Sequence, residues 1–324
     1  MLVPDSPLSD SPYEVLGVPA DADHDTLRRA HRRRLRETHP DTGGRADEFH
    51  AVQAAWDLIG TPEGRARYDR GRLAHADEPA SWAPRARERR ETRPQARSYG
   101  HPGGWMRQRY LELVREWAGR GADLDDPFDA RIVQSAPREL RLLLADAIAE
   151  EATAAQIAEL GIAYTAWHDV IVEQRGFSGG FAPGEDGLGP ASATKLDHVV
   201  LGPSGLFAVA SQDWGAPVKL KRGELIGEGL THGETPFATL AQRAKALGRA
   251  ARVRVSGLLI VVPDGASPEG VLDAGKHRGM AAALVQRPRL PHVLRIGVLG
   301  APAIGGQELF EVRTRLQEAV RFVE

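Results

Sequence analysis

A polar stretch over residues 71–104 divides this 324-residue chain and most constrains how it can fold. The stretch holds four prolines, ends in a Gly-Gly pair and has few aliphatic side chains. We expect a linker there, because the stretch cannot bury enough apolar surface to offset the entropy cost of ordering it. A chain of this length typically holds about two domains. The sequence therefore predicts one compact unit at residues 11–70 and a second that begins at residue 105.

Charge and cysteine content narrow the classes of function. Basic residues number 42 and acidic residues 44, for a formal net charge of −2. This balance excludes a chain-wide electrostatic attraction to nucleic acid or to an anionic membrane, although a local basic patch is compatible with it. The chain has no cysteine, which excludes disulfides, Cys-based zinc sites and thiol nucleophiles. Any metal would need oxygen and nitrogen ligands.

The amino-terminal sequence lacks the basic start and apolar stretch of a signal peptide. The longest apolar run, residues 257–262, is far too short to cross a bilayer. We therefore expect a cytoplasmic protein with no membrane partner.

The second unit is expected to be a helical segment over residues 105–160 followed by an α/β domain over residues 161–324. Asp126-Pro127 is typical of a helix start, and the Gly-rich residues 176–189 predict a flexible loop. Helices are expected at about 137–160, 236–249 and 307–322, and strands at about 162–172, 196–201, 206–213, 258–262, 282–286 and 294–299.

Two apolar stripes flank a stiff tripeptide in the first unit. On an ideal helix over residues 27–36, apolar side chains share one face and five arginines share the other. A matching apolar stripe runs from Phe49 to Ile59, so we expect two antiparallel helices with the arginines in solvent. His39-Pro40-Asp41 lies between the helices, where proline restricts the backbone. The arginines are Arg28, Arg29, Arg32, Arg33 and Arg36.

The stretches PYEVLGV, AHRRRLRETHPDTGG, EFHAVQAAWDLI and GRARYD, in this order, resemble the J domain of the DnaJ co-chaperone family over residues 11–70. The resemblance implies an all-α helical hairpin that docks on a DnaK-type chaperone and triggers its ATP hydrolysis. His39, Pro40 and Asp41 would be the triggering residues. The five arginines would form the docking face, where charge steers an acidic partner.

This unit departs from the family at two positions. Arg34 lies at the middle of the apolar face, where the family usually carries Leu, and His31 replaces the usual Tyr. The stem of Arg34 is expected to cover the core while its guanidinium reaches water. The zinc-binding repeats of some DnaJ proteins are impossible without cysteine, and the glycine/phenylalanine-rich stretch is missing. The rest of the chain is therefore expected to be specialised.

Arginines are also concentrated in and beside the linker. From Arg85 to Arg109, eight arginines against two glutamates leave a net charge of +6. The segment is interpreted either as a solvated, self-repelling tether or as an arm for nucleic acid or an acidic partner.

The hairpin LDHVVLGPSGLFAVASQDW resembles part of the NERD (nuclease-related) domain, a branch of the PD-(D/E)xK nuclease fold, with coverage of about residues 140–300. Such nucleases hydrolyse phosphodiesters with a divalent cation, usually Mg²⁺, that carboxylates hold, and a lysine assists. By this resemblance Asp197 matches the first hairpin carboxylate. Either Glu150 or Glu151 matches the helix glutamate, and Gln242 lies on the Gln-bearing helix.

The return strand of this hairpin lacks the remaining catalytic residues. Ala210, Ser211 and Gln212 stand where the family has an acidic residue, any residue and lysine. Asp213 would point to the opposite face of a regular strand and would replace the acidic residue only if a one-residue bulge turned it inward. His198 is interpreted as a polar strand residue rather than a metal ligand. We therefore expect an inactive nuclease-like domain and assign no metal ligands.

The sequence as a whole predicts a J-domain co-chaperone without a cofactor, whose C-terminal domain targets it to a client protein or to nucleic acid. Residues 195–254 carry nine basic against five acidic residues, a net charge of +4 that is compatible with nucleic-acid binding. The alternative function is a metal-dependent nuclease recruited through its J domain, which would need Mg²⁺. A third is a nucleic-acid-binding adaptor without chemistry.

Overall fold

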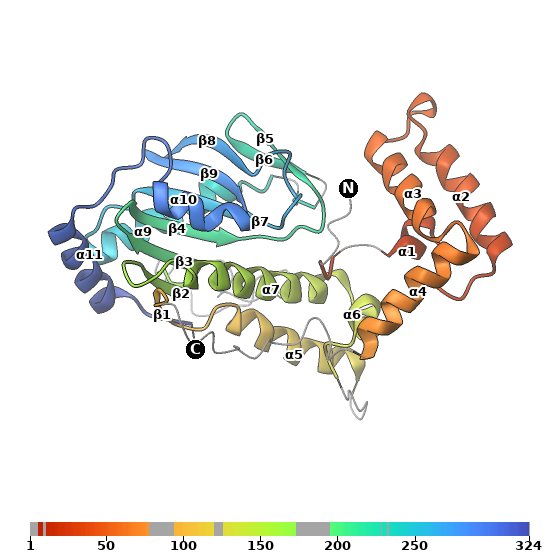
Figure 1. The fold of residues 1–324 in the computed structure, drawn as a ribbon, viewed down its shortest axis with the longest axis horizontal. Coiled ribbons are helices and arrows are strands. Elements are labelled where there is room, and N and C mark those ends of the chain that lie inside the picture. The colour runs from red at the N-terminus through yellow and green to blue at the C-terminus, as the bar shows by residue number, and fades with distance from the viewer. Residues whose placement is uncertain are drawn as a thin grey trace.

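A computed structural model describes residues 6–8, 11–77, 94–119, 126–172, 195–227, 229–231 and 233–323. An all-helical unit at the N-terminus is followed by a larger unit in which helices cover a mixed sheet (Figure 1). The fold class expected from the sequence, an all-α unit plus an α/β unit, is therefore confirmed at this level. The Gly-rich residues 176–189 lie outside the described residues.

Local capping signals define the helices of the first unit. Ser11 and Glu14 form a reciprocal capping box at the first helix, and Asp23 caps the second by accepting from the Thr26 amide. The elements are α1 (Pro12–Leu16), α2 (His24–Thr38), the 3₁₀ turn η1 (Pro40–Thr42), α3 (Ala46–Ile59) and α4 (Pro62–Asp77).

The apolar stripes of α2 and α3 meet as the sequence predicts. Leu27, Val52 and Ile59 are fully buried in the core of this unit. His31 stacks on Trp56 with ring centroids 4.2 Å apart. The guanidinium of Arg34 donates to the carbonyl of Val15 on α1 at 3.3 Å, so the side chain joins two helices rather than only reaching water.

A seven-stranded sheet organises the second unit, in the order β1-β2-β3-β4-β7-β9-β8. β2, β3 and β4 are antiparallel, whereas β4, β7 and β9 are parallel. β5 and β6 form a separate hairpin. The strands are β1 (Arg97–Tyr99), β2 (Thr165–Ile171), β3 (Lys195–Gly202), β4 (Gly205–Ser211), β5 (Val218–Lys221), β6 (Glu224–Gly227), β7 (Gly257–Val262), β8 (Val271–His277) and β9 (Met280–Gln286).

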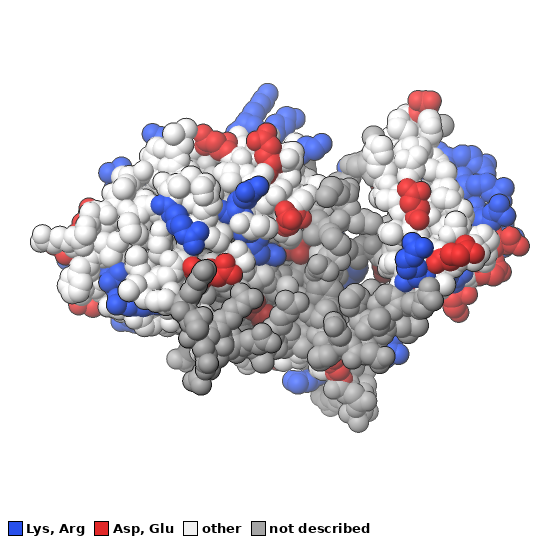
Figure 2. Space-filling view, in the orientation of Figure 1, with Lys and Arg blue, Asp and Glu red and all other residues white. Residues whose placement is uncertain are grey.

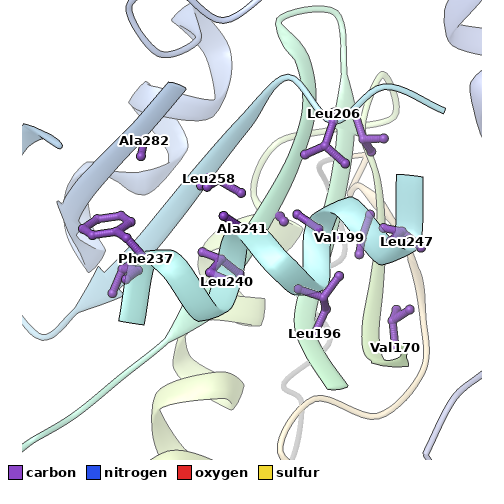
Figure 3. Packing of buried hydrophobic residues seen from close by; sticks show 14 of the residues in the cluster. Val170, Leu196, Val199, Leu206, Phe237, Leu240, Ala241, Leu247, Leu258 and Ala282 are labelled. Atoms are coloured by element: carbon purple, nitrogen blue, oxygen red, sulfur yellow. The ribbon is translucent and has the colours of Figure 1, made fainter. Parts of the chain in front are cut away.

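Helices cover both faces of the sheet. On one face, α9 and α11 pack through side chains such as Phe237 and Leu316. Figure 3 shows the apolar side of α9 against residues of the sheet, among them Val199 and Leu258. On the other face lie α7 and α10, and α5 packs on the outer side of α7. The helices are α5 (Gly104–Ala118), α6 (Ala130–Ser135), α7 (Arg138–Ala158), α9 (Pro236–Ala251), α10 (Leu290–Ile296) and α11 (Gly306–Ala319).

The structure corrects the expected boundaries of the linker at residues 71–104. Helix α4 runs on to Asp77, and β1 at Arg97–Tyr99 pairs in parallel with β2. Arg107 and Arg109, counted with the arginine-rich segment, lie in α5. The core of the linker, residues 78–93, lies outside the described residues.

Two local predictions in the second unit are wrong. Residues 294–299 were expected to be a strand, but Leu290–Ile296 form α10, with proline in its first turn and Gly297 at its C-cap. Asp126 does not cap a helix at Pro127, because α6 begins at Ala130 and Asp129 accepts from the Arg131 amide.

Two short hairpins share an unusual turn. The β5–β6 hairpin turns through Arg222-Gly223, and the β8–β9 hairpin turns through Arg278-Gly279. The φ angles of the arginines are 53° and 50°, and those of the glycines are 83° and 88°. Two-residue turns with both φ angles positive match the twist of the strands and favour Asn-Gly. Arginine in this conformation costs about 1 kcal/mol.

The segment before the first helix contacts the second unit. Ser6 and Leu8 are both about 5% exposed. Ser6 hydrogen-bonds the carboxylate of Asp213, and Leu8 lies so close to Gly215 that a β-carbon there would clash. The chain is thus attached to the sheet unit before α1 begins.

Candidate functional sites

The His39-Pro40-Asp41 tripeptide forms the tip between α2 and α3. His39 ends α2 in an extended conformation, and its Nδ1 accepts from the Asp41 amide at 3.2 Å. The His39 ring also lies edge-on to Phe49, with centroids 5.2 Å apart. Gly44 approaches the backbone of Thr38 too closely for any β-carbon, which closes the loop tightly. The Asp41 side chain is 89% exposed and therefore open to solvent.

The five arginines of α2 lie on its solvent side, and all are exposed. Figure 2 shows basic side chains gathered over α2. Backbone carbonyls orient two of them, since Arg32 and Arg36 each donate to the carbonyl four residues earlier. Arg33 lies 3.7 Å from Glu37, an exposed pair that neutralises little of the field. The structure thus brings the arginine face and the tripeptide onto one helix and the loop that ends it.

A buried ionic cluster lies between α7 and the sheet. Lys195 on β3 donates from Nζ to Glu150 of α7 at 2.5 Å and to Asp169 of β2 at 2.6 Å. Asp197, two residues along β3, lies 3.6 Å from the same nitrogen. The side chains of Lys195, Glu150 and Asp169 are each 2% exposed. One ammonium therefore compensates three carboxylates away from water.

The strand geometry that builds this cluster is irregular. The β2–β3 register places Asp169 opposite Asp197, since its neighbours pair as 168 with 198 and 170 with 196. Asp169 has a φ of 53°, a left-handed conformation that is rare inside a strand. This irregularity lies at Asp169, whose carboxylate contacts Lys195, whereas Asp197 shares a face with Lys195 because the two are two residues apart on β3.

Of the four residues that the nuclease resemblance singled out, two lie in this cluster and two lie elsewhere. Asp197 and Glu150 lie in it together. Glu151 points to α5, where both of its oxygens accept from Arg107 at 2.6 Å. Gln242 is exposed on α9, whereas its neighbour Arg243 lies near enough to Asp197 to feel its charge. Sequence reasoning missed Lys195 and Asp169 as cluster members.

Burial and charge act against each other within this site. Burial lowers the pKa of Lys195, but attraction to Glu150, Asp197 and Asp169 outweighs it, so the pKa lies above its usual value. Burial raises the pKa of Glu150 well above normal, although Lys195 opposes the shift. Burial and the nearby charge of Asp197 raise the pKa of Asp146, one turn earlier on α7, to about 8. Removal of the Lys195 charge would therefore leave buried carboxylates without the cation that compensates them.

A second polar chain crosses four strands beside the cluster. Ser98, His168, His198 and Ser211 are linked in turn by contacts of 2.9, 2.7 and 2.8 Å. The two histidines meet through their Nδ1 atoms, so one must donate and the other accept. Burial, together with His168 and Lys195, lowers the pKa of His198 well below normal. His198 is therefore held neutral and satisfied within the sheet.

The return strand β4 ends at Ser211, earlier than the residue 213 expected from the sequence, so Asp213 lies outside the strand. Ser211 bonds to His198, and its amide donates to Asp197 at 2.8 Å. Asp213 follows the end of β4, accepts from the Gly215 amide and bonds to Ser6. Burial raises the pKa of Asp213. Its carboxylate is thus committed to loop and N-terminal contacts.

Within the described ranges, no group of three or more His, Asp or Glu side chains is arranged to hold a metal ion. Lys195 occupies the centre of the acidic cluster instead. Among the described residues, no helix is both long and apolar enough to cross a membrane.

Comparison with known proteins identifies the first unit. Residues 11–69 match the model of the DnaJ domain family, so the N-terminal helices form a J domain. The same region is 44% identical over 61 residues to a "Chaperone protein DnaJ" of Gloeothece citriformis and 51% identical over 59 residues to one of Tropheryma whipplei. It is 41% identical over 66 residues to "Chaperone protein DnaJ 1" of Cutibacterium acnes.

These matches are confined to one part of the chain. They cover 18–20% of this chain, which spans only 16–17% of the length of these curated relatives. The similarity to these relatives is therefore similarity of the J domain and does not extend to the sheet unit.

Proposed function

We propose that the protein is a J-domain co-chaperone that stimulates ATP hydrolysis by a DnaK-type chaperone. The observation that carries this proposal is the exposed His39-Pro40-Asp41 tip at the end of a helix whose outer face holds five exposed arginines. Such a face would attract an acidic partner and speed its association, with a dependence on ionic strength. The sheet unit would then target the chaperone to a client.

Single-turnover ATP hydrolysis by DnaK, measured with and without the full-length protein at low salt, tests this proposal. The wild-type protein should accelerate hydrolysis, and His39→Gln or Asp41→Asn should abolish the acceleration. His50→Gln and Asp25→Asn are matched controls, because both residues are exposed and belong to the helices beside the tip. Unchanged hydrolysis with wild-type protein would refute the proposal, as would full activity of both tripeptide variants.

For the sheet unit we infer a nuclease-related fold of the NERD type whose catalytic centre is inactive. Two features support this assignment: the helix–strand–hairpin order, and the meeting of Glu150 and Asp197 in one cluster. Lys195 fills the centre of that cluster, where a cation-dependent nuclease would hold Mg²⁺. An ammonium buried to 2% exposure leaves little room for a hydrated divalent ion.

Incubation of the protein with DNA and with RNA, in the presence of Mg²⁺ or Mn²⁺, tests the inactive assignment. We expect no cleavage by the wild-type protein or by Asp197→Ala. Cleavage by the wild-type protein that disappears in Asp197→Ala would overturn it and favour the alternative function, a nuclease recruited through its J domain. The Glu112→Ala variant serves as a control, because Glu112 is a surface carboxylate on α5.

A further inference from the structure

The tips of two hairpins come together on one edge of the sheet unit. His277, at the end of β8, contacts the carbonyl of Gly223 in the β5–β6 turn at 2.9 Å through its Nε2. Gly223 also lies close to the backbone of Ala274. The turns Arg222-Gly223 and Arg278-Gly279 therefore belong to one surface rather than to two independent loops.

This twin-turn surface is strongly basic. It comprises five exposed cations on or next to the two turns. Two carboxylates lie beside these cations. Glu224 is half-buried and accepts from the amides of Phe237 and Ala238 at the start of α9, so it is engaged inward. Asp273, exposed on β8, accepts from the Gly275 amide. Figure 2 shows basic side chains projecting above β5 and β6. The five cations are Lys219, Lys221, Arg222, Lys276 and Arg278.

The backbone of the turns points to a role for their arginines. Both turns have a left-handed first residue, a position where Asn or Gly is favoured and a long side chain is strained. Arginine stands there in both turns, so each of these two arginines lies at the tip of its hairpin and is exposed. Strain that recurs at two adjacent positions is typical of functional surfaces.

We propose that the twin-turn surface binds the phosphate backbone of double-stranded nucleic acid. Guanidinium groups bind phosphate oxygens in pairs, and the lysines add point charges around them. The side chains that the turns expose are charged rather than apolar, which suits a nucleic-acid interface better than a protein interface with an apolar centre. Such contacts carry no base information, so binding is independent of sequence. This surface is separate from the J domain and goes beyond the co-chaperone function.

Fluorescence anisotropy of a labelled 20-base-pair DNA duplex of arbitrary sequence, titrated with full-length protein, tests the proposal. The wild-type protein should bind, and the double variant Arg222→Asn/Arg278→Asn should bind about tenfold more weakly at 50 mM salt. The slope of log affinity against log salt should fall by about 2, one for each lost phosphate contact. Asn accepts the left-handed backbone, so this variant should keep the fold, which its thermal unfolding checks.

Arg252→Asn provides the matched control. Arg252 is an exposed arginine with a φ of 55°, and it lies at the C-terminal end of α9, the end remote from the two turns. This variant should bind the duplex as the wild-type protein does. The proposal is wrong if wild-type protein does not bind, or if the double variant keeps wild-type affinity and salt slope. Stronger binding of poly-glutamate than of the duplex, at equal charge, would overturn it in favour of an acidic protein.

Discussion

Replacement of Lys195 by methionine should reveal how much of the sheet unit's stability depends on one buried ammonium. Lys195→Met keeps the length of the side chain but removes the ammonium that contacts Glu150 and Asp169 and lies 3.6 Å from Asp197, which retains the nearby charge of Arg243. Loss of one partner from a buried ion pair costs about 3–5 kcal/mol. Because Lys195 serves two carboxylates at 2.5 and 2.6 Å, we expect about 5 kcal/mol at pH 8.

The pH dependence of this loss follows from linkage. Lys195 opposes the rise that burial causes in the pKa of Glu150, so without Lys195 the pKa of this one carboxyl rises further above its unfolded value. The folded protein then holds an extra proton, so its stability decreases as the pH rises through the folded pKa. Each extra proton changes the free energy of unfolding by about 1.4 kcal/mol per pH unit. The variant should therefore regain about 3 kcal/mol between pH 8 and pH 6.

Urea unfolding of full-length protein at pH 8 and pH 6, followed by tryptophan fluorescence, measures both effects. Lys245→Met is the matched control, because Lys245 is an exposed lysine on α9, and it should be neutral at both pH values. The double variant Lys195→Met/Glu150→Gln should recover part of the loss at pH 8. The reasoning fails if Lys195→Met matches the control at pH 8, or if its loss does not shrink at pH 6.

Three further changes should affect stability in directions that the structure sets. Asp146→Asn should stabilise the protein at pH 8 more than at pH 5, in thermal melts, because a folded pKa of about 8 makes the wild-type protein lose stability as the pH rises from about 4 to 8. Between pH 7 and pH 5, the wild-type protein should lose stability because unfolding lets His198 take up a proton. His198→Gln should remove about 1.4 kcal/mol per pH unit of that loss in urea titrations, and an unchanged slope would contradict this. Arg278→Asn should raise the free energy of unfolding by about 1 kcal/mol, because asparagine suits the left-handed turn.

Patterned segments could be predicted from the sequence because their side chains alternate between core and solvent. The α2 and α3 stripes and the last helix follow this rule, whereas the strand at 257–262 is buried throughout and is recognised by its unbroken apolar run. The β8 strand was missed because residues 271–277 lie at an edge and are mostly exposed. The β5 strand does alternate, with Val218 and Leu220 inward and the lysines outward, and that signal was available.

The buried cluster could be predicted only in part. Lys195 and Asp197 stand two residues apart on one strand, so their common face was visible in the sequence. Asp169 could not be assigned, since its inward direction depends on a left-handed backbone that no local residue pattern predicts. The choice between Glu150 and Glu151 required the position of α5, because Arg107 on that helix binds Glu151.

The contact of Ser6 and Leu8 with the sheet unit limits how far the start of the J domain can lie from that unit. Leu8 rests against Gly215, and α1 is capped by Ser11, three residues later. Three residues span at most about 10 Å, so the start of α1 stays within that reach of the sheet. A chaperone that binds the J domain would thereby be recruited to a fixed neighbourhood of the sheet unit. A ligand bound to the sheet unit would then meet the chaperone at a high local concentration. The short connection between the two units, rather than a higher binding affinity, would cause this effect.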